Sequence, residues 1–374
     1  MKVKISGYAT AEGTESYASK ALSQGKVVRS HFKQFDGLTF TSLGMGTYLG
    51  SLDSRDDEEM ESAIKQSIRS GAINVIDTAI NYRLQKSEKC VGRALSSLIE
   101  QDLVTREQVF VSTKNGYLAL DADHKRGYGK YIADELLAKG IIDVKDIVGS
   151  SHCMTIPFLK HELDRSLKNL GLETIDLIYL HNSAESQLVE VTKQDYFERL
   201  KDAFSFYETA RADGKIRYYG LATWNCFRNN PSERDYLNLE DVVFLAEEAG
   251  GKEHGFRFIQ FPYNIGMPEA LVKRNQVVQN EDITLLKACE HYRIGVFTSV
   301  PLMQGKLLNY ELPKLDGLTK VQVSIQFARS SNGVIAPLVG HKLSAHVKEN
   351  IQIAETMPLE DSEFAAVFRV GSGA

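Results

Sequence analysis

The chain has 374 residues, of which 43% are hydrophobic and 25% charged, as in a globular protein with a complete core. Its net charge is −5 and its pI about 6.0, which gives no indication of a nucleic-acid or anionic-membrane partner. No apolar run has the length of a signal peptide or a membrane span, and the four cysteines form no CxxC pair, so we expect a cytoplasmic protein with reduced thiols.

Strands and helices are expected to alternate from about residue 34, after a polar N-terminal extension over 1–33 that lacks sustained periodicity. A turn at Asp36-Gly37 joins two short extended pieces. The following patterns predict strands over 41–46, 74–77 and 108–114, and helices over 56–70 and 86–100. A long insertion over 115–157, with a helical part near 131–139, then interrupts the alternation of strands and helices.

The alternation resumes after the insertion. The patterns predict strands over 176–181, 216–222, 257–262, 294–300 and 334–339. They predict helices over 158–170, 194–213, 239–248, 281–291, 320–329 and, as the last element, 345–356. About eight strands alternate with about eight helices, which leaves a closed (β/α)8 barrel or a doubly wound sheet. No GxGxxG turn follows the first strand, so we favour a single TIM-barrel domain over 34–374.

Several predicted strands end in residues that can carry chemistry. The second ends in Asp77, the third in Lys114 and the fourth in His181, while Tyr82 lies in the loop after the second. In a barrel, the C-terminal strand ends meet at one face. A lysine ammonium near the tyrosine favours the phenolate, the aspartate holds the lysine charged, and the histidine can donate a hydrogen bond to a carbonyl oxygen. Such a group needs a hydride source.

Five segments in order closely resemble the aldo-keto reductases. They read DTAINY with SEKCVGRAL, VFVSTKNG, LDRSLKNLGLETIDLIYLHN, GKIRYYGLAT and GHKLSAHVKEN, and the similarity runs from about residue 38 to 354. The resemblance implies a (β/α)8 barrel that acts on an aldehyde, ketone or sugar with a nicotinamide cofactor. It implies Tyr82 as general acid, Lys114 and Asp77 as its tuning pair, and His181 as the residue that orients the carbonyl group.

The resemblance also implies a set of cofactor-binding positions along the mouth of the barrel. These are Gly46, Thr47, Thr223, Gln260, Ser299, Pro301, Leu302, Gln304, Lys306, Gly340, Lys342, His346, Glu349 and Asn350. The family's usual lysine and arginine near the adenosine phosphate are Gly340 and His346 here, so Lys342 or Lys348 would have to supply that charge. We expect NADP, with NAD as the alternative. The ring that stacks on the nicotinamide in the family corresponds to Ser299, with Phe297 two residues earlier on the same strand face.

Other interpretations of these residues stay open. Asp77 and Lys114 can form a purely structural ion pair, and His152, Cys153 and His181 can suggest a metal site, although a tetrahedral site needs further ligands at suitable spacing. We expect no metal. Trp224 can line the pocket or pack in the core.

Two classes of function fit the sequence. One is an oxidoreductase for a small carbonyl or sugar substrate, and the other is a regulatory subunit that senses a nicotinamide cofactor with little turnover. Residues 115–157, 224–238 and 263–280 are expected to enclose the substrate, because loops at this face of a barrel set specificity. The substrate, the direction of reaction, the oligomeric state and the role of residues 1–33 stay open.

Overall fold

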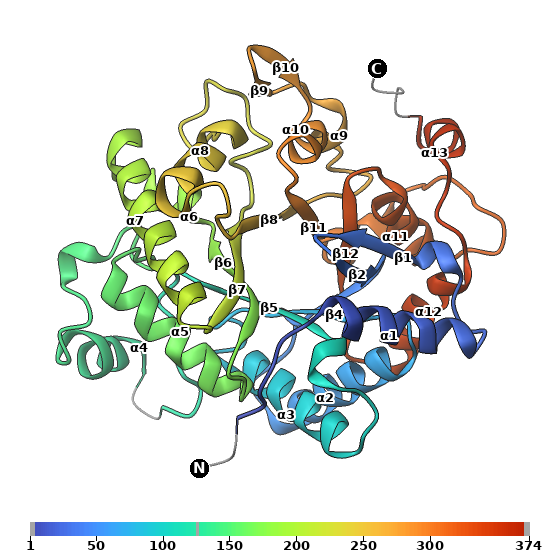
Figure 1. Ribbon diagram of the computed structural model, residues 1–374, viewed down its shortest axis with the longest axis horizontal. Coiled ribbons are helices and arrows are strands. Elements are labelled where there is room, and N and C mark those ends of the chain that lie inside the picture. Colours follow the sequence, from blue (N-terminus) through green and yellow to red (C-terminus); the bar gives the residue numbers. More distant parts are fainter. Residues whose placement is uncertain (1–3, 125–126, 370–374) are drawn as a thin grey trace.

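Eight parallel strands form a closed barrel in this computed structural model, which describes residues 4–124 and 127–369. The helices form an outer ring around the strands (Figure 1). The order around the barrel is β11-β12-β3-β4-β5-β6-β7-β8. The strands are β3 (Gly44–Gly46), β4 (Val75–Asp77), β5 (Phe110–Asn115), β6 (Ile175–His181), β7 (Ile216–Ala222), β8 (Phe256–Pro262), β11 (Gly295–Ser299) and β12 (Val334–Gly340). The predicted fold class is confirmed.

The outer helices pack around the strands, most of them through one apolar face, while α11 is buried from Gln322 to Ser330. They are α2 (Ser54–Arg69), α3 (Lys86–Glu100), α5 (Ile156–Leu170), α7 (Lys193–Ala212), α8 (Leu239–Gly250), α10 (Leu285–His291), α11 (Lys320–Ser330) and α12 (Ser344–Ile351). On α2, the buried stripe includes Met60, Ile64 and Ile68 at helical spacing. Asp53 caps this helix through the backbone N–H of Asp56. The four cysteines are free and buried, as expected for packing thiols.

The N-terminal segment closes one end of the barrel. Helix α1 (Ala11–Ser23) and the hairpin of β1 (Phe32–Phe35) with β2 (Leu38–Thr41) lie across that end (Figure 1). Phe40 of the hairpin contacts three rings of the barrel interior, Phe110, Phe258 and Phe297, at centroid distances of 5.1, 6.2 and 5.8 Å. The hairpin turn at Asp36-Gly37 was predicted, but α1 was not, because its apolar stripe is short and rich in alanine.

The insertion is built from short elements, including α4 (Tyr128–Tyr131) and a π-helical turn (Ile132–Leu137), close to the predicted helical part. Further short elements are α6 (Ser183–Gln187), α9 (Glu269–Val272), β9 (Gln276–Val278), β10 (Glu281–Ile283) and α13 (Asp361–Phe368).

Three predicted boundaries were wrong. Residues 281–283 form β10, since they pair with β9, and the helix begins only at Leu285 after the Thr284 cap. The predicted last helix over 345–356 becomes a 3₁₀ turn after Ile351, and α13 follows it. The first barrel strand starts at Gly44, because Thr41 belongs to the hairpin.

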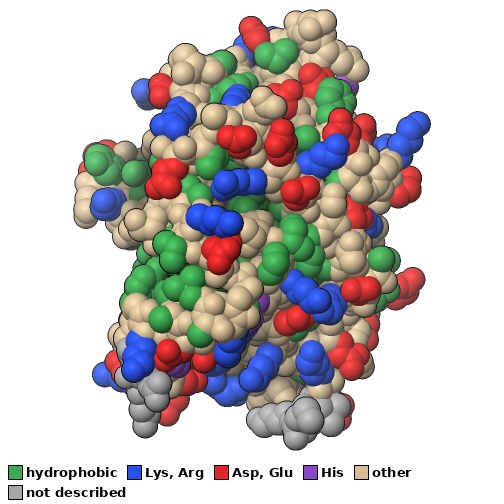
Figure 2. All heavy atoms as spheres, turned by 90° about the vertical axis from the view of Figure 1, so that its left-hand side faces the viewer, with side chains coloured by type: hydrophobic (Ala, Val, Ile, Leu, Met, Phe, Trp, Pro, Cys, Tyr) green, Lys and Arg blue, Asp and Glu red, His purple; other side chains and the backbone are tan. Residues whose placement is uncertain are grey.

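The surface carries charges of both signs. On the face in Figure 2, Lys and Arg side chains are interspersed with Asp and Glu. Within residues 4–124 and 127–369, none of the helices combines the length and apolar character that crossing a membrane requires.

Candidate active site

Three strand ends bring the predicted catalytic side chains to one rim of the barrel. Asp77 is the last residue of β4, Lys114 lies near the end of β5, and His181 is the last residue of β6. These strands are neighbours with parallel register, Asp77 beside Ser112 and Lys114 beside Tyr179. Parallel pairing sends all three C-terminal ends to the same face, where barrel active sites lie.

Asp77 and Lys114 form a buried ion pair. Lys114 Nζ lies 2.5 Å from Asp77 Oδ2 and donates a second hydrogen bond to the Thr78 carbonyl at 2.8 Å. Burial favours the neutral amine, but the charges of Asp77 and Tyr82 outweigh it, so the pKa of Lys114 lies above its ordinary value. The lysine is therefore a fixed cation at the rim.

Tyr82 lies over this ammonium, with Lys114 Nζ 4.8 Å from the centroid of its ring. Its ring is 6.0 Å from that of His181 and 5.0 Å from that of Tyr48. Burial raises the pKa of Tyr82, and the opposing effect of Lys114 is smaller, so the net direction is upward. The sequence argument considered only the lysine and missed this burial cost. At neutral pH the phenol keeps its proton, as a proton donor must.

His181 is a neutral imidazole. Burial, Lys114 and His152 all lower its pKa well below the ordinary value. Its Nδ1 atom is buried and has no hydrogen-bond partner in the described part of the chain. A buried polar atom without a partner at a rim of this kind is available to a bound molecule.

A chain of side chains holds the backbone of His181. Arg199 donates to Gln187 Oε1 at 2.7 Å, and the Gln187 amide donates to His152 Nδ1 at 2.9 Å. His152 Nε2 then donates to the His181 carbonyl at 2.9 Å. The arginine fixes the orientation of the glutamine amide, and the amide fixes the histidine tautomer. Sequence reasoning considered His152 only as a metal ligand, and no cluster of three or more His, Cys, Asp or Glu suited to a metal occurs among the described residues.

Aromatic rings surround the rim. Tyr117 of the insertion meets the His181 and His152 rings edge to face at 5.1 and 5.3 Å. Tyr48 is 56% and Trp224 43% exposed, so the tryptophan is not a core residue. Glu185 accepts the backbone N–H of Trp224 at 2.7 Å, and Arg228 donates to its carbonyl at 2.8 Å, which fixes the peptide that carries this ring.

The positions predicted to face a nicotinamide lie at the same rim, but most have protein partners. Gln260 Nε2 donates to Asp77 Oδ1 at 3.1 Å, Thr47 Oγ1 donates to the Asp77 carbonyl at 3.1 Å, and the backbone N–H of Thr223 donates to the Gln260 carbonyl at 2.8 Å. Gly46 pairs with Asp77 in the barrel. Ser299 ends β11 and is half-buried.

Phe297 is not placed to stack on a ring at the mouth. It is 1% exposed and stacks on Phe258 inside the barrel, with 5.7 Å between centroids. The two-residue offset along the strand has moved this ring down into the core, where Phe40 and Phe110 also pack against it.

The loop after β11 has the backbone expected of an anion-binding turn. Val300, Met303, Gln304 and Gly305 all have positive φ, and Lys306 is exposed beside them. Successive backbone N–H groups in such turns form concave sites for anions. Pro301 is buried and Leu302 half-buried under this turn.

The segment after β12 is partly committed to internal contacts. Lys342 pairs with Asp56 and lies 3.7 Å from Glu59. Asn350 hydrogen-bonds to buried His341 at 3.0 Å, and the Glu349 carbonyl accepts from Gln322 at 2.9 Å. His346 and Lys348 are exposed, and a Cβ added to Gly340 would approach no atom closer than 3.8 Å.

The chain matches the model of the aldo/keto reductase family over residues 42–320. It belongs to this family. Among curated proteins it is 27% identical over 188 residues to a D-threo-aldose 1-dehydrogenase from Pseudomonas sp., covering 50% of this chain and 51% of that protein. It is 26% identical over 278 residues to an NADH-specific methylglyoxal reductase from Escherichia coli, covering 72% and 66%. The matched region thus spans about half the length of the Pseudomonas protein and about two thirds of the length of the Escherichia coli protein.

Solved structures of the family share the fold. An aldo/keto reductase from Klebsiella pneumoniae in complex with NADP and acetate has a TM-score of 0.57 at 19% identity, covering 92% of this chain and 94% of that one. The holo form of an aldo-keto reductase from Bacillus halodurans has a TM-score of 0.59 at 19% identity, covering 92% and 97%.

The residues present fit a nicotinamide dinucleotide. The unpartnered His181 Nδ1 and the strand-end amide of Gln260 can face the ring, and the left-handed turn with Lys306 can hold the pyrophosphate. His346, Lys348 and Lys342 are the cationic side chains that would hold an adenosine phosphate, and Lys342 already lies beside two carboxylates, those of Asp56 and Glu59.

Proposed function

We propose that this protein is an NADP(H)-dependent oxidoreductase that interconverts an aldehyde, ketone or sugar carbonyl with the corresponding alcohol. The observation that carries the proposal is the position of the Tyr82 ring 4.8 Å from a lysine ammonium fixed by a buried aspartate, beside a neutral histidine. The bound reduced nicotinamide would supply the hydride. NADP is preferred over NAD because related folds are crystallised with it.

In the reducing direction, the Tyr82 hydroxyl gives its proton to the substrate oxygen as hydride reaches the carbonyl carbon. The products are the alcohol, the oxidised cofactor and a Tyr82 phenolate, which regains a proton from water. Lys114 stabilises the phenolate through its positive charge, and Asp77 keeps that charge in place. His181, a neutral imidazole, donates a hydrogen bond from its ring that holds the substrate oxygen.

Substrate choice is assigned to the loops that carry the surrounding rings. The loops over 224–238 and 263–280 are tied together, since Arg228 pairs with Glu269 at 2.9 Å and Asn275 donates to the Phe227 carbonyl at 3.0 Å. We assign the contacts with substrate to these loops and to Tyr117 of the insertion, and their aromatic and hydrogen-bonding side chains suit a polar or polyhydroxylated carbonyl compound.

The test is NADPH consumption with a panel of aldehydes, ketones and aldoses. We expect turnover with at least one class and a loss of about 100-fold or more in kcat for Tyr82→Phe, since general acid catalysis contributes that much. The matched control is Tyr128→Phe, an exposed insertion tyrosine. Unchanged turnover in Tyr82→Phe would contradict the proton-donor role. NADPH binding without turnover of any compound would favour the regulatory alternative.

A further inference from the structure

The three residues after Tyr82 form a left-handed run of backbone. Arg83, Leu84 and Gln85 have φ angles of 49°, 51° and 70°, and none of them is glycine. Residues with a Cβ rarely adopt this conformation, and a run of three persists only where surrounding contacts impose it. The contacts that hold this turn therefore also determine where the Tyr82 ring lies.

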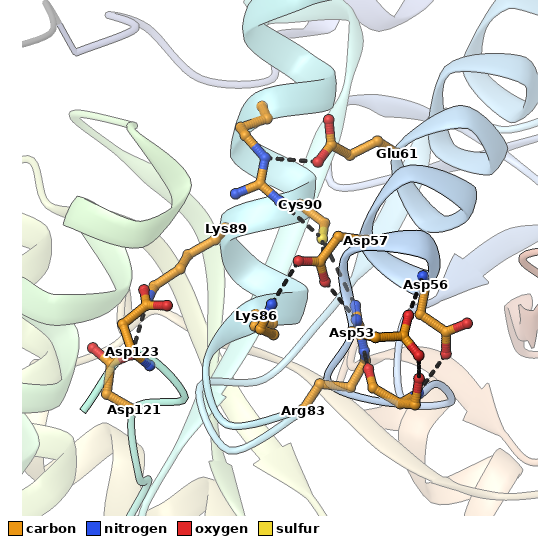
Figure 3. A network of polar contacts seen from close by, with 12 residues as sticks. Asp53, Asp56, Asp57, Glu61, Arg83, Lys86, Lys89, Cys90, Asp121 and Asp123 are labelled. Carbon is orange, nitrogen blue, oxygen red and sulfur yellow. Dashed lines mark hydrogen bonds and ion pairs between the residues drawn. The ribbon is translucent and has the colours of Figure 1, made fainter. Parts of the chain in front are cut away.

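Arg83 supplies the strongest of these contacts. Its side chain is 2% exposed and reaches across to the start of α2, where Arg83 Nη2 lies 2.5 Å from Asp57 Oδ1 (Figure 3). Its Nε donates to the Ser51 carbonyl at 2.8 Å, and its Nη1 donates to Cys90 Sγ at 3.7 Å. Every nitrogen of the guanidinium group thus has a partner. Two of these partners, Ser51 and Asp57, lie in the segment after β3.

The fit around the guanidinium is close. A Cβ added to Gly50 would lie 2.9 Å from Arg83 Nε, so the backbone of the loop before α2 packs directly on it. Asp57 also accepts Lys86 Nζ at 2.7 Å. Burial raises the pKa of Asp57, but its bonds to Lys86 and Arg83 outweigh this, and the pKa lies below the ordinary value. The partner of Arg83 is thus a charged carboxylate.

The insertion and α5 hold the other end of the turn. The Leu84 carbonyl accepts the backbone N–H of Ala122 at 3.0 Å, and Gln85 Oε1 accepts from Asn169 at 3.0 Å. These contacts fix residues 84 and 85 without reaching residue 83. The backbone of Tyr82 donates to the Ala79 carbonyl at 3.0 Å, and the Arg83 carbonyl accepts the backbone N–H of Lys86 at 3.1 Å. The Arg83 side chain adds the link from this turn to Ser51 and Asp57, in the segment after β3.

We propose that Arg83 is a positioning residue for Tyr82, which it holds over the Lys114 ammonium by anchoring the left-handed turn to Asp57 and Ser51. The proposal rests on the proposed role of Tyr82 as proton donor. Arg83 acts through the backbone, and its charged group is engaged with α2 and the preceding loop.

The experiment compares Arg83→Met with Arg83→Lys and Arg93→Met. We expect Arg83→Met to lower kcat about 10- to 100-fold, because small displacements of a catalytic group have effects of this size. KM and the NADPH dissociation constant, measured by protein fluorescence quenching, should change less than about threefold. Arg83→Lys should recover part of kcat by keeping the charge near Asp57. Arg93→Met removes an arginine of α3, the helix that follows the turn, where it binds Glu61 at 2.6 Å, and should leave kcat unchanged.

The pH profile separates positioning from a purely structural role. Burial raises the pKa of Tyr82 and Lys114 lowers it, so a phenol that moves away from the lysine and stays buried should lose its proton at higher pH. The basic limb of kcat should move upward in Arg83→Met and stay in place in Arg93→Met. Loss of folded protein alone would lower kcat by the same factor at every pH and would leave the pH of the basic limb unchanged.

If Arg83→Met does not fold, Asp57→Asn tests the same link, with Lys86→Met as control for the other partner of Asp57. We expect a lower kcat in Asp57→Asn only. A kcat within twofold of wild type in Arg83→Met, or in Asp57→Asn where Arg83→Met is unfolded, would overturn the proposal. The proposed function would still stand if Tyr82→Phe is inactive, whereas turnover in Tyr82→Phe would reject that function first.

Discussion

Gln260 and Asp77 are joined by a hydrogen bond of 3.1 Å from Nε2 to Oδ1. Gln260 lies near the end of β8 and Asp77 ends β4, and these two strands stand on opposite sides of the closed barrel. The residue expected to hold the cofactor amide thus also supports the aspartate that binds Lys114.

We predict that Gln260→Met lowers kcat about tenfold, because a hydrogen bond to a charged group contributes about 1.5–3 kcal/mol. Ser112→Ala, which removes the other bond to Asp77 Oδ1, at 2.7 Å, should act similarly. Steady-state kinetics and NADPH titration provide the measurement. Weaker NADPH binding with an unchanged kcat would show that Gln260 serves only the cofactor.

Lys114→Met should destabilise the fold by about 3–5 kcal/mol, because it leaves the buried carboxylate of Asp77 without its cation. The double variant Asp77→Asn with Lys114→Met should recover most of this stability and remain inactive. Urea unfolding of all four forms gives the coupling energy. Additive destabilisation would show that the pair is not coupled.

His152→Phe should lower kcat about tenfold, since the His181 carbonyl loses its donor and Gln187 loses its acceptor. Burial lowers the pKa of His152 to about 4, so this residue stays neutral through an ordinary assay range. The pH–activity profiles of the wild type and of His152→Phe should therefore have the same shape between pH 5 and 8. A limb that is lost in His152→Phe would mean that His152 titrates in the cycle.

Asp56→Asn should strengthen NADPH binding about threefold or more and leave NADH binding unchanged, because it releases Lys342 from the closer of its two carboxylates. The matched control is Glu58→Gln, an exposed residue of the same helix. Equal effects of both variants on NADPH would indicate a general change of charge, with no specific role for Lys342.

Lys33 should make stability depend on pH. Its ammonium is buried against the carbonyls of Arg329 and Val334, and burial lowers its pKa to about 7. The unfolded chain, with an ordinary lysine pKa near 10.4, binds more protons above pH 7, so this residue adds stability as pH rises from about 7 towards 10.

The measurement is urea unfolding of wild type and Lys33→Met at several pH values. Their difference is the relevant quantity, because buried cysteines and tyrosines titrate in the opposite sense above pH 8. We expect the free energy of unfolding of the wild type to increase relative to that of the variant as pH rises. A difference that does not change with pH would contradict the shifted pKa of Lys33.

The sequence by itself determined the barrel and its family, because alternating periodicity and ordered motifs are local properties of the chain. It also indicated which strand ends carry Asp77, Lys114 and His181, since parallel pairing sends every C-terminal end to one face. These outcomes need only the order and type of the elements.

Only the tertiary structure decided the depth and the partners of each group. Phe297 lies in the core because its register places it below the rim, and burial moves the pKa of Tyr82 upward despite Lys114. Arg83 meets Asp57, and His152 meets His181, through contacts 26 and 29 residues apart. Such distances and desolvation costs depend on how segments far apart in the sequence pack together. A local sequence pattern holds no information about that packing.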